Sequence, residues 1–245
     1  AYNVAVGKNA GLSVTTGTKN TLIGGISGDA LTTGSENTAL GYDALGGATD
    51  GGRNVAIGNN TLRLSDTSGS NYNVAVGYDA GASVTTGTTN TLVGGLTGDA
   101  ITTGGNNVAM GYAALSGDTL GSRNVAIGVA ALQVQNFTTA TDAYNTAVGT
   151  LAGAAVTTGI YNTILGGLAG DGLTDADQNV AIGYAALSSD QLGSKTTAIG
   201  TQALVSQQFT GASDVYNTAV GFQAGLAVTT GIRNTLIGGI AGDAL

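Results

Sequence analysis

One five-residue phrase recurs fourteen times along this chain: usually Asn, then Val or Thr, then most often Ala, then an aliphatic residue, then Gly. Its starts are spaced by 17 residues, except for three longer intervals of 19, 21 and 21 residues: 3, 20, 37, 54, 73, 90, 107, 124, 145, 162, 179, 196, 217 and 234. A fixed period of this length indicates a solenoid, whose coils bury a core only by stacking on one another. We therefore expect an all-β fold: a parallel β-solenoid or β-roll of about fourteen 17-residue coils, numbered here from these starts.

Within each phrase the residues alternate as those of a β-strand do. The second and fourth positions, such as Val4 and Val6, should share one face of the strand. The third position is usually Ala, with Leu22, Leu92 or Leu236 in other coils, and should point to the opposite face. Because both faces are apolar, we expect the strand to be buried on both sides. The small Ala side suits close contact with another chain, which predicts a side-by-side homotrimer.

Two columns of the aligned phrases are nearly invariant. The first position is Asn in thirteen coils, with Thr196 as the exception, and the fifth is Gly in all fourteen. Stacked Asn amides can hydrogen-bond along a cross-β array, and an unbroken Gly column requires either a positive φ or backbones too close for a Cβ. We interpret both columns as a structural ladder, represented in the first four coils by Asn3, Asn20, Asn37, Asn54, Gly7, Gly24, Gly41 and Gly58.

Four coils form a larger repeat, whose fourth coil carries the extra residues. The predicted super-repeats are 3–72, 73–144, 145–216 and a partial 217–245, within one array over 1–245. Both ends have the sequence of internal coils, since Ala1 has the register of Ala143 and Leu245 that of Leu31. Terminal coils of solenoids normally carry capping sequence, so we expect this array to be part of a longer fibre.

The three longer coils place aromatic residues in their loops, around 63–72, 133–144 and 205–216. Insertions in repeat proteins lie on one face, which is often the binding face. This makes weak ligand-binding candidates of Phe137, Phe209, Tyr72, Tyr144 and Tyr216. The alternative is a tolerated bulge whose aromatic ring packs on the solenoid.

The composition argues against several classes of function. The net charge is −8 with only seven scattered basic residues, so no nucleic-acid partner is expected. No apolar run is long enough to insert into a membrane. His and Cys are absent and Glu36 is the single Glu, so we expect no enzyme, no cofactor and no metal site. The closest acidic pair, Asp175 and Asp177, occurs once, and this leaves a glycan-cleaving spike as a minor alternative.

Two further patterns have structural alternatives. Gly-Asp recurs once per super-repeat, at Asp29, Asp99, Asp171 and Asp243. Successive members should lie about 19 Å apart, too far to share an ion, so solvated turns are the simpler interpretation. Thr-Thr-Gly turns raise an ice-binding hypothesis, but Thr49-Asp50, Thr119-Leu120 and Gln191-Leu192 interrupt that Thr array in the third coil of each super-repeat.

The phrases Asn54 to Gly58 and Asn145 to Gly149, each followed by a small residue three positions on, resemble head repeats of trimeric autotransporter adhesins. Those heads are left-handed parallel β-rolls in which three chains pack side by side. The longer segments 37–45, 107–115 and 179–187 are also similar to repeats of phage tail-fibre proteins. The resemblance covers essentially all fourteen coils and implies fibre formation and adhesion, without any catalytic residue.

Together these observations predict a structural fibre segment of an extracellular adhesin, which attaches to a surface or host through an unknown receptor or glycan. The alternative in the same class is the shaft of a bacteriophage tail fibre or receptor-binding protein. The expected location is accordingly the cell surface or the virion surface.

Overall fold

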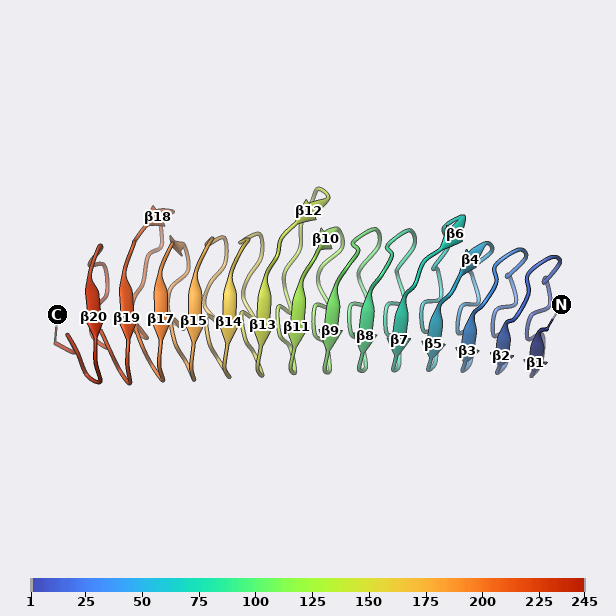
Figure 1. The fold of residues 1–245 in the computed structure, drawn as a ribbon, viewed down its shortest axis with the longest axis horizontal. Helices are drawn as coiled ribbons and strands as arrows, with labels where there is room; N and C mark the ends of the chain where they lie inside the picture. Colours follow the sequence, from blue (N-terminus) through green and yellow to red (C-terminus); the bar gives the residue numbers. More distant parts are fainter. Residues whose placement is uncertain (1, 245) are drawn as a thin grey trace. The chain divides into compact units, whose positions relative to one another are not determined.

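The computed structural model describes residues 2–244, so the predictions that concern Ala1 and Leu245 lie outside the described residues. Within 2–244 each phrase forms a three-residue strand, and the chain is a parallel β-solenoid of fourteen coils (Figure 1). These strands are β1 (Val4–Val6), β2 (Thr21–Ile23), β3 (Thr38–Leu40), β5 (Val55–Ile57), β7 (Val74–Val76), β8 (Thr91–Val93), β9 (Val108–Met110), β11 (Val125–Ile127), β13 (Thr146–Val148), β14 (Thr163–Leu165), β15 (Val180–Ile182), β17 (Thr197–Ile199), β19 (Thr218–Val220) and β20 (Thr235–Ile237). No helix in this part of the chain is long and apolar enough to cross a bilayer.

Six two-residue strands lie outside the main strands: β4 (Gly51–Gly52), β6 (Gly69–Ser70), β10 (Gly121–Ser122), β12 (Thr141–Asp142), β16 (Gly193–Ser194) and β18 (Ser213–Asp214). β4 pairs in parallel with β6, and β16 with β18. β6 and β18 belong to the longer coils, and in Figure 1 their loops extend beyond the neighbouring coils. The extra residues of the long coils therefore leave the coil path as projecting loops.

The chain divides into two compact units, residues 1–122 with 138–141, and residues 123–137 with 142–245. In the first unit the strand order is β1-β2-β3-β5-β7-β8-β9, and each neighbouring pair is parallel. In the second unit the order is β11-β13-β14-β15-β17-β19-β20, again parallel. Equivalent positions pair throughout, as in Ala39 with Ala56, so each column of the sequence alignment is a column in space.

The third position of each strand points into the coil. Ala39, Ala56 and Ala75 are fully buried, whereas their neighbours on the strand, such as Val55, are half-buried. The prediction that the Ala side faces another chain is therefore wrong. The second and fourth positions form the outer face, so the prediction that the strand is buried on both sides requires a further chain to cover this face.

The interior volume explains why Ala occupies the inward position. In the third and fourth coils of a super-repeat a Leu from the turn, such as Leu45 or Leu62, lies fully buried with φ near +50°. In the first two coils Gly takes this place, and Leu22 of the strand fills the space instead, since a Cβ on Gly28 would lie 2.9 Å from Leu22 Cδ2. The first coil of a super-repeat has neither, with Ala75 and Gly81 for example, and its space is filled by Leu62 and Leu92 of the coils on either side, so close packing leaves no room for a second large side chain there.

The invariant Gly column satisfies both conditions that the sequence suggested. Gly94 has φ +138°, and a Cβ there would lie 2.5 Å from the carbonyl oxygen of Gly111 in the next coil. The same positive φ and close approach to the next Gly occur at Gly7, Gly24, Gly41 and Gly58. Each coil therefore turns a corner directly against the backbone of its neighbour, where no side chain fits.

The Asn column forms the predicted hydrogen-bonded ladder, and it lies in the interior. Asn20 is fully buried, and its Oδ1 accepts a hydrogen bond from the backbone N–H of Asn37 at 3.0 Å. Its Nδ2 donates to the carbonyl oxygen of Gly34 at 2.9 Å. Asn3 repeats both bonds, to the Asn20 N–H and the Gly17 carbonyl. One amide thus joins two coils and closes its own turn, which satisfies backbone groups that burial would otherwise leave unpaired.

The long coils modify this ladder with an inserted polar side chain. Gln207 is buried, donates to the Thr196 hydroxyl at 3.1 Å and accepts from Asn217 Nδ2 at 2.8 Å. Gln135, at the same position of its coil, accepts from Asn145 at 2.9 Å. Within the described residues the Nδ2 of Asn54 has no hydrogen-bond partner, because Ser68, fourteen positions ahead, lies in a projecting loop.

Candidate functional site

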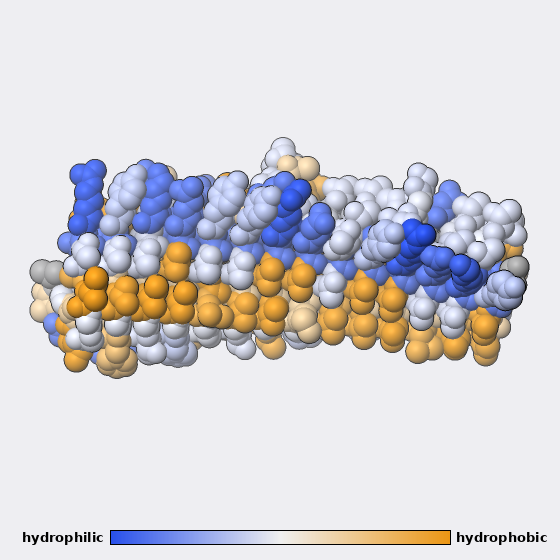
Figure 2. Space-filling model, viewed as in Figure 1, coloured by the Kyte–Doolittle hydropathy of each residue, from blue (hydrophilic) through white to orange (hydrophobic). Residues whose placement is uncertain are grey.

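The outer face of the strands is an apolar strip without charged residues. We define the outer strip as the second- and fourth-position side chains of the main strands. Its second column contains only Thr and Val, and its fourth only Val, Ile, Leu and Met. Figure 2 shows it as an orange band over the strands, and Leu40, Met110 and Leu165 are more than 40% exposed. Contiguous exposed apolar surface of this kind marks interaction sites in soluble proteins.

An aromatic column borders the outer strip, one residue after the invariant Gly. Tyr42, Tyr78, Tyr112, Tyr184 and Phe222 are each more than half exposed. In the second coil of each super-repeat this position is Gly, and the next ring packs against it: a Cβ on Gly25 would lie 3.3 Å from Tyr42 Cδ2. The sequence analysis overlooked these residues, although their four-coil recurrence after the Gly column was a usable signal.

The three loop tyrosines each lie under a cation from the preceding coil. Arg53 stands over the Tyr72 ring, Arg123 over Tyr144 and Lys195 over Tyr216, each 5.4 Å from the ring centroid. All six residues have φ between 52° and 63°. Tyr144 also stacks on Tyr161, with centroids 5.8 Å apart. Cation–π contacts at exposed sites contribute about 0.5–1 kcal/mol, so these pairs hold the loops in place.

The other two predicted aromatic residues, Phe137 and Phe209, are less exposed to solvent than the three tyrosines. Phe137 is only 5% exposed, as the bulge interpretation expected, and Phe209 is half-buried. The Phe209 backbone N–H donates to Asp190 at 2.9 Å, which anchors that loop. Of the five loop candidates, the three tyrosines are exposed and therefore remain the better ones for contact with a ligand.

Acidic groups complete each cation–tyrosine pair. Arg123 is 2.9 Å from Asp142, and Lys195 is 2.6 Å from Asp214. Arg53 instead pairs with Glu36 at 2.8 Å, and Lys19 bonds the other carboxylate oxygen at 3.1 Å. The hydrogen bond from Arg53, followed by that from Lys19, lowers the pKa of Glu36 below its usual value. Exposed pairs of this kind contribute little to stability, about 0–1 kcal/mol each.

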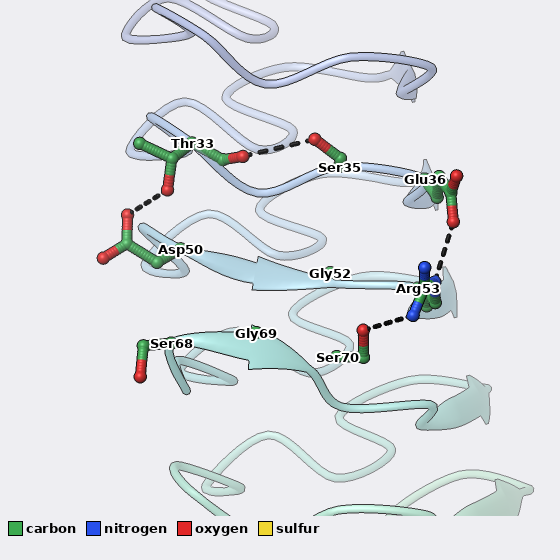
Figure 3. Close-up of a pocket in the computed structure, with 9 residues that line it drawn as sticks. All are labelled: Thr33, Ser35, Glu36, Asp50, Gly52, Arg53, Ser68, Gly69 and Ser70. Carbon is green, nitrogen blue, oxygen red and sulfur yellow. Dashed lines mark hydrogen bonds and ion pairs between the residues drawn. The ribbon is translucent and has the colours of Figure 1, made fainter.

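A shallow hollow of about 350 Å³ lies beside the first long loop, and we name it the loop hollow. In Figure 3 Asp50 and Thr33 lie at one end, Arg53 and Glu36 at the other, and Gly52 and Gly69 between them. The remaining lining residues are Ser35, Ser68 and Ser70. At one end Thr33 donates to Asp50 Oδ1 at 2.6 Å, and at the other Arg53 Nη1 donates to Ser70 Oγ at 2.6 Å. Two opposite charges therefore stand at fixed positions above a floor of glycine backbone.

The remaining acidic residues act within the fold. Asp175 accepts from the Thr158 hydroxyl at 2.6 Å and Asp177 from the Ile160 N–H at 2.8 Å, so both bind the preceding coil. Burial raises the pKa of Asp99 and of Asp171, and one carboxylate oxygen of each is buried without a partner. Among residues 2–244 no three acidic groups lie close enough to hold a metal ion. The pKa of Asp43 is raised above its usual value, mainly by burial. Arg63 lowers this pKa, and the negative charge of Asp29 raises it further.

Comparisons with protein-family models, with curated proteins and with solved structures found no match to this chain.

Proposed function

We propose that this chain is a structural segment of a surface fibre of the adhesin type, which holds an attachment site away from the surface that carries it. The observation that carries the proposal is the outer strip, an apolar face that runs along the stacked coils. The core of these coils is already buried on the other side of the strands. A solenoid needs no such face for its own folding, since its core lies inside the coils.

The internal bonding suits a load-bearing segment. Each main strand pairs with those before and after it within a unit, and the buried Asn ladder adds side-chain bonds across the same boundary. Separating two coils therefore requires the loss of several buried hydrogen bonds at once. Buried donors and acceptors left unpaired cost about 1–3 kcal/mol each, so the stack resists local opening.

We assign the outer strip to contact with further copies of this chain, in a side-by-side homotrimer. Seven strands of three residues span about 34 Å by 10 Å, or about 340 Å² of flat surface in each unit. The aromatic column at the border of the strip adds further apolar surface.

Sedimentation equilibrium tests this assembly. The wild-type protein should sediment at three times its chain mass, and Ile182→Lys with Ile199→Lys should sediment as a folded monomer, because both replacements place a charge on the outer strip. Gln208→Lys, at an exposed loop position, is the matched control and should remain trimeric. A wild-type monomer with the circular dichroism of a folded β protein would refute the assembly.

A tail-fibre shaft is the alternative within the same class, because its physical task is the same. Immunogold labelling of the native protein on intact cells and on purified virions distinguishes the two. Binding of the labelled protein to host cells or host material tests attachment itself, and loss of that binding with the loops exchanged for those of short coils would place it on the loops.

The outer strip also gives ice binding a specific observation in its favour. Thr occupies eight of the fourteen places in its second column and Val the other six, and equivalent residues pair in register. This is a different array from the interrupted Thr-Thr-Gly turns. Thermal hysteresis that the Ile182→Lys with Ile199→Lys variant loses would favour this function over assembly.

A further inference from the structure

We propose that the loop hollow binds a neutral saccharide, one or two sugar rings in size, as a ligand-binding function separate from the assembly of the fibre. The hollow is defined by its residues above and lies wholly within the first unit. Its volume of about 350 Å³ is at the lower end of the range of about 300–1,000 Å³ for ligand pockets.

The two charged ends each retain hydrogen-bonding capacity for a ligand. Asp50 Oδ1 accepts from the hydroxyls of Thr32 and Thr33, and among residues 2–244 no hydrogen bond engages its Oδ2. Arg53 uses Nε for Glu36 and Nη1 for Ser70 and Tyr72, which leaves Nη2 without a partner in the described chain. One end therefore accepts and the other donates, and both groups are held in place by their existing bonds.

This arrangement selects a ligand with neutral hydroxyl groups. An anion is attracted by Arg53 and Lys19 but repelled by Asp50 and Glu36, and for a cation the signs are reversed, so neither charge gains a net attraction from this group. A sugar hydroxyl donates to a carboxylate and accepts from a guanidinium, and hydrogen bonds to charged groups are stronger than those between neutral groups. Asp50 and Arg53 are three residues apart on an extended segment, about 10 Å, so hydroxyls at opposite edges of one ring or on two linked rings are needed to meet both ends.

The floor between the charged ends is open at Gly69, whereas Gly52 is buried against the Ser35 carbonyl. A Cβ built on Gly69 would meet no atom within 4 Å, and Gly69 has φ +125°, a conformation that favours glycine. Figure 3 shows Gly52 and Gly69 side by side beneath this space. A sugar ring can therefore lie flat over Gly69 while its hydroxyl groups reach the side chains at each end.

The two carboxylates of the hollow are not part of the repeat, whereas the cation at Arg53 recurs as Arg123 and Lys195. At the position of Asp50 the next two super-repeats have Leu120 and Leu192, and at the position of Glu36 they have Asn106 and Gln178. The ladder and the strip recur in every coil, whereas this combination of charges occurs in one super-repeat. Its residues therefore serve a purpose that the stacking of coils does not require.

Saturation-transfer difference NMR on the whole chain tests the proposal, with the methyl glycosides of galactose, glucose and mannose and with the dimer of N-acetylglucosamine as neutral probes. Sialyllactose is the anionic probe and the glucosamine dimer the cationic one. At least one neutral probe should bind, and Asp50→Asn should weaken it about tenfold, because Oδ1 still accepts from the threonines while Oδ2 becomes an NH₂ donor.

Two further variants complete the test. Ser68→Tyr should block the hollow without removing any bond described here, and Asp214→Asn, beside the cation of the third super-repeat, should leave binding unchanged. Circular dichroism establishes that each variant is folded. The proposal is overturned if no neutral probe binds, if a charged probe binds more tightly than every neutral one, or if Asp50→Asn and Ser68→Tyr both bind as the wild type does.

Discussion

The side-chain oxygen of Asn37 accepts a hydrogen bond from the backbone N–H of Asn54, 17 residues ahead, at 2.9 Å. The amide nitrogen of Asn37 donates to the carbonyl of Gly51 at 2.9 Å, and the whole side chain is buried. A single residue type thus bonds the next coil through its oxygen and its own turn through its nitrogen. Neither Asp, which lacks the donor, nor Leu, which lacks both groups, can replace it.

Asn90→Ala should destabilise the protein by about 2–4 kcal/mol, because the Gly104 carbonyl and the Asn107 N–H each lose the buried bond that Asn90 makes. Chemical denaturation measures this change. Asn59→Ala, at an exposed position outside the ladder, is the control and should change the free energy of unfolding by less than about 0.5 kcal/mol. Equal effects of the two substitutions would contradict the role of the ladder.

Gly94→Ala should destabilise the fold more than Gly69→Ala does. Both positions have a positive φ, so both variants suffer backbone strain of about 1–3 kcal/mol. Only at Gly94 does the new Cβ also meet the backbone of the next coil, at Gly111. Thermal unfolding of the two variants separates the steric clash with Gly111 from the backbone strain that both variants share. Equal unfolding midpoints would show that the close approach of the coils at Gly94 does not contribute to stability.

Gln207→Ala should be destabilising by about 1–3 kcal/mol, because Thr196, Asp190 and Asn217 each lose a buried hydrogen-bond partner. The neighbouring Gln208 is exposed, so Gln208→Ala should be nearly neutral. Urea denaturation of both variants makes the comparison. A neutral Gln207→Ala would mean that water replaces the amide in this coil.

The stability of the protein should depend on the charge of Asp99. Burial, with a smaller contribution from Asp79, raises the pKa of Asp99 above 3.8, so its carboxyl holds a proton more firmly in the folded state. Its contribution to folding is therefore fully present below that ordinary pKa and is lost as the pH rises through the folded value. Asp99→Asn should raise the unfolding midpoint relative to wild type more at about pH 7 than at about pH 3.

The pKa of Glu36 should depend on Arg53. The guanidinium lowers it below the ordinary value of 4.5, so Glu36 contributes to stability above that value and loses the contribution as the pH falls through the lowered pKa. In Arg53→Gln an NMR titration of the Glu36 carboxyl should show a pKa nearer to 4.5, with Lys19 still lowering it. An unchanged pKa of Glu36 in Arg53→Gln would show that Arg53 and Glu36 are not in contact in solution.

Much of the fold was predictable because it depends on local constraints that repeat. The unbroken Gly column indicated a positive φ or a close approach, and Gly94 shows both. The Asn column indicated stacked amides, which Asn20 and Asn37 form. The candidate site was less predictable. The loop tyrosines were identified, but the cation over Tyr72 comes from Arg53, 19 residues earlier, and only the loop path brings the two together.

The sequence by itself determined the number of coils, the position of each strand and the registration of equivalent residues, because a fixed period allows one stacking of like on like. It left open which side of the strand faces inward, since alternation shows only that every second residue shares a face and both faces here are apolar. The tertiary structure decided this point. Turn residues such as Leu45 enter the coil and occupy its limited volume, so only Ala fits beside them on the inner face, and the larger Val, Ile and Leu side chains face outward.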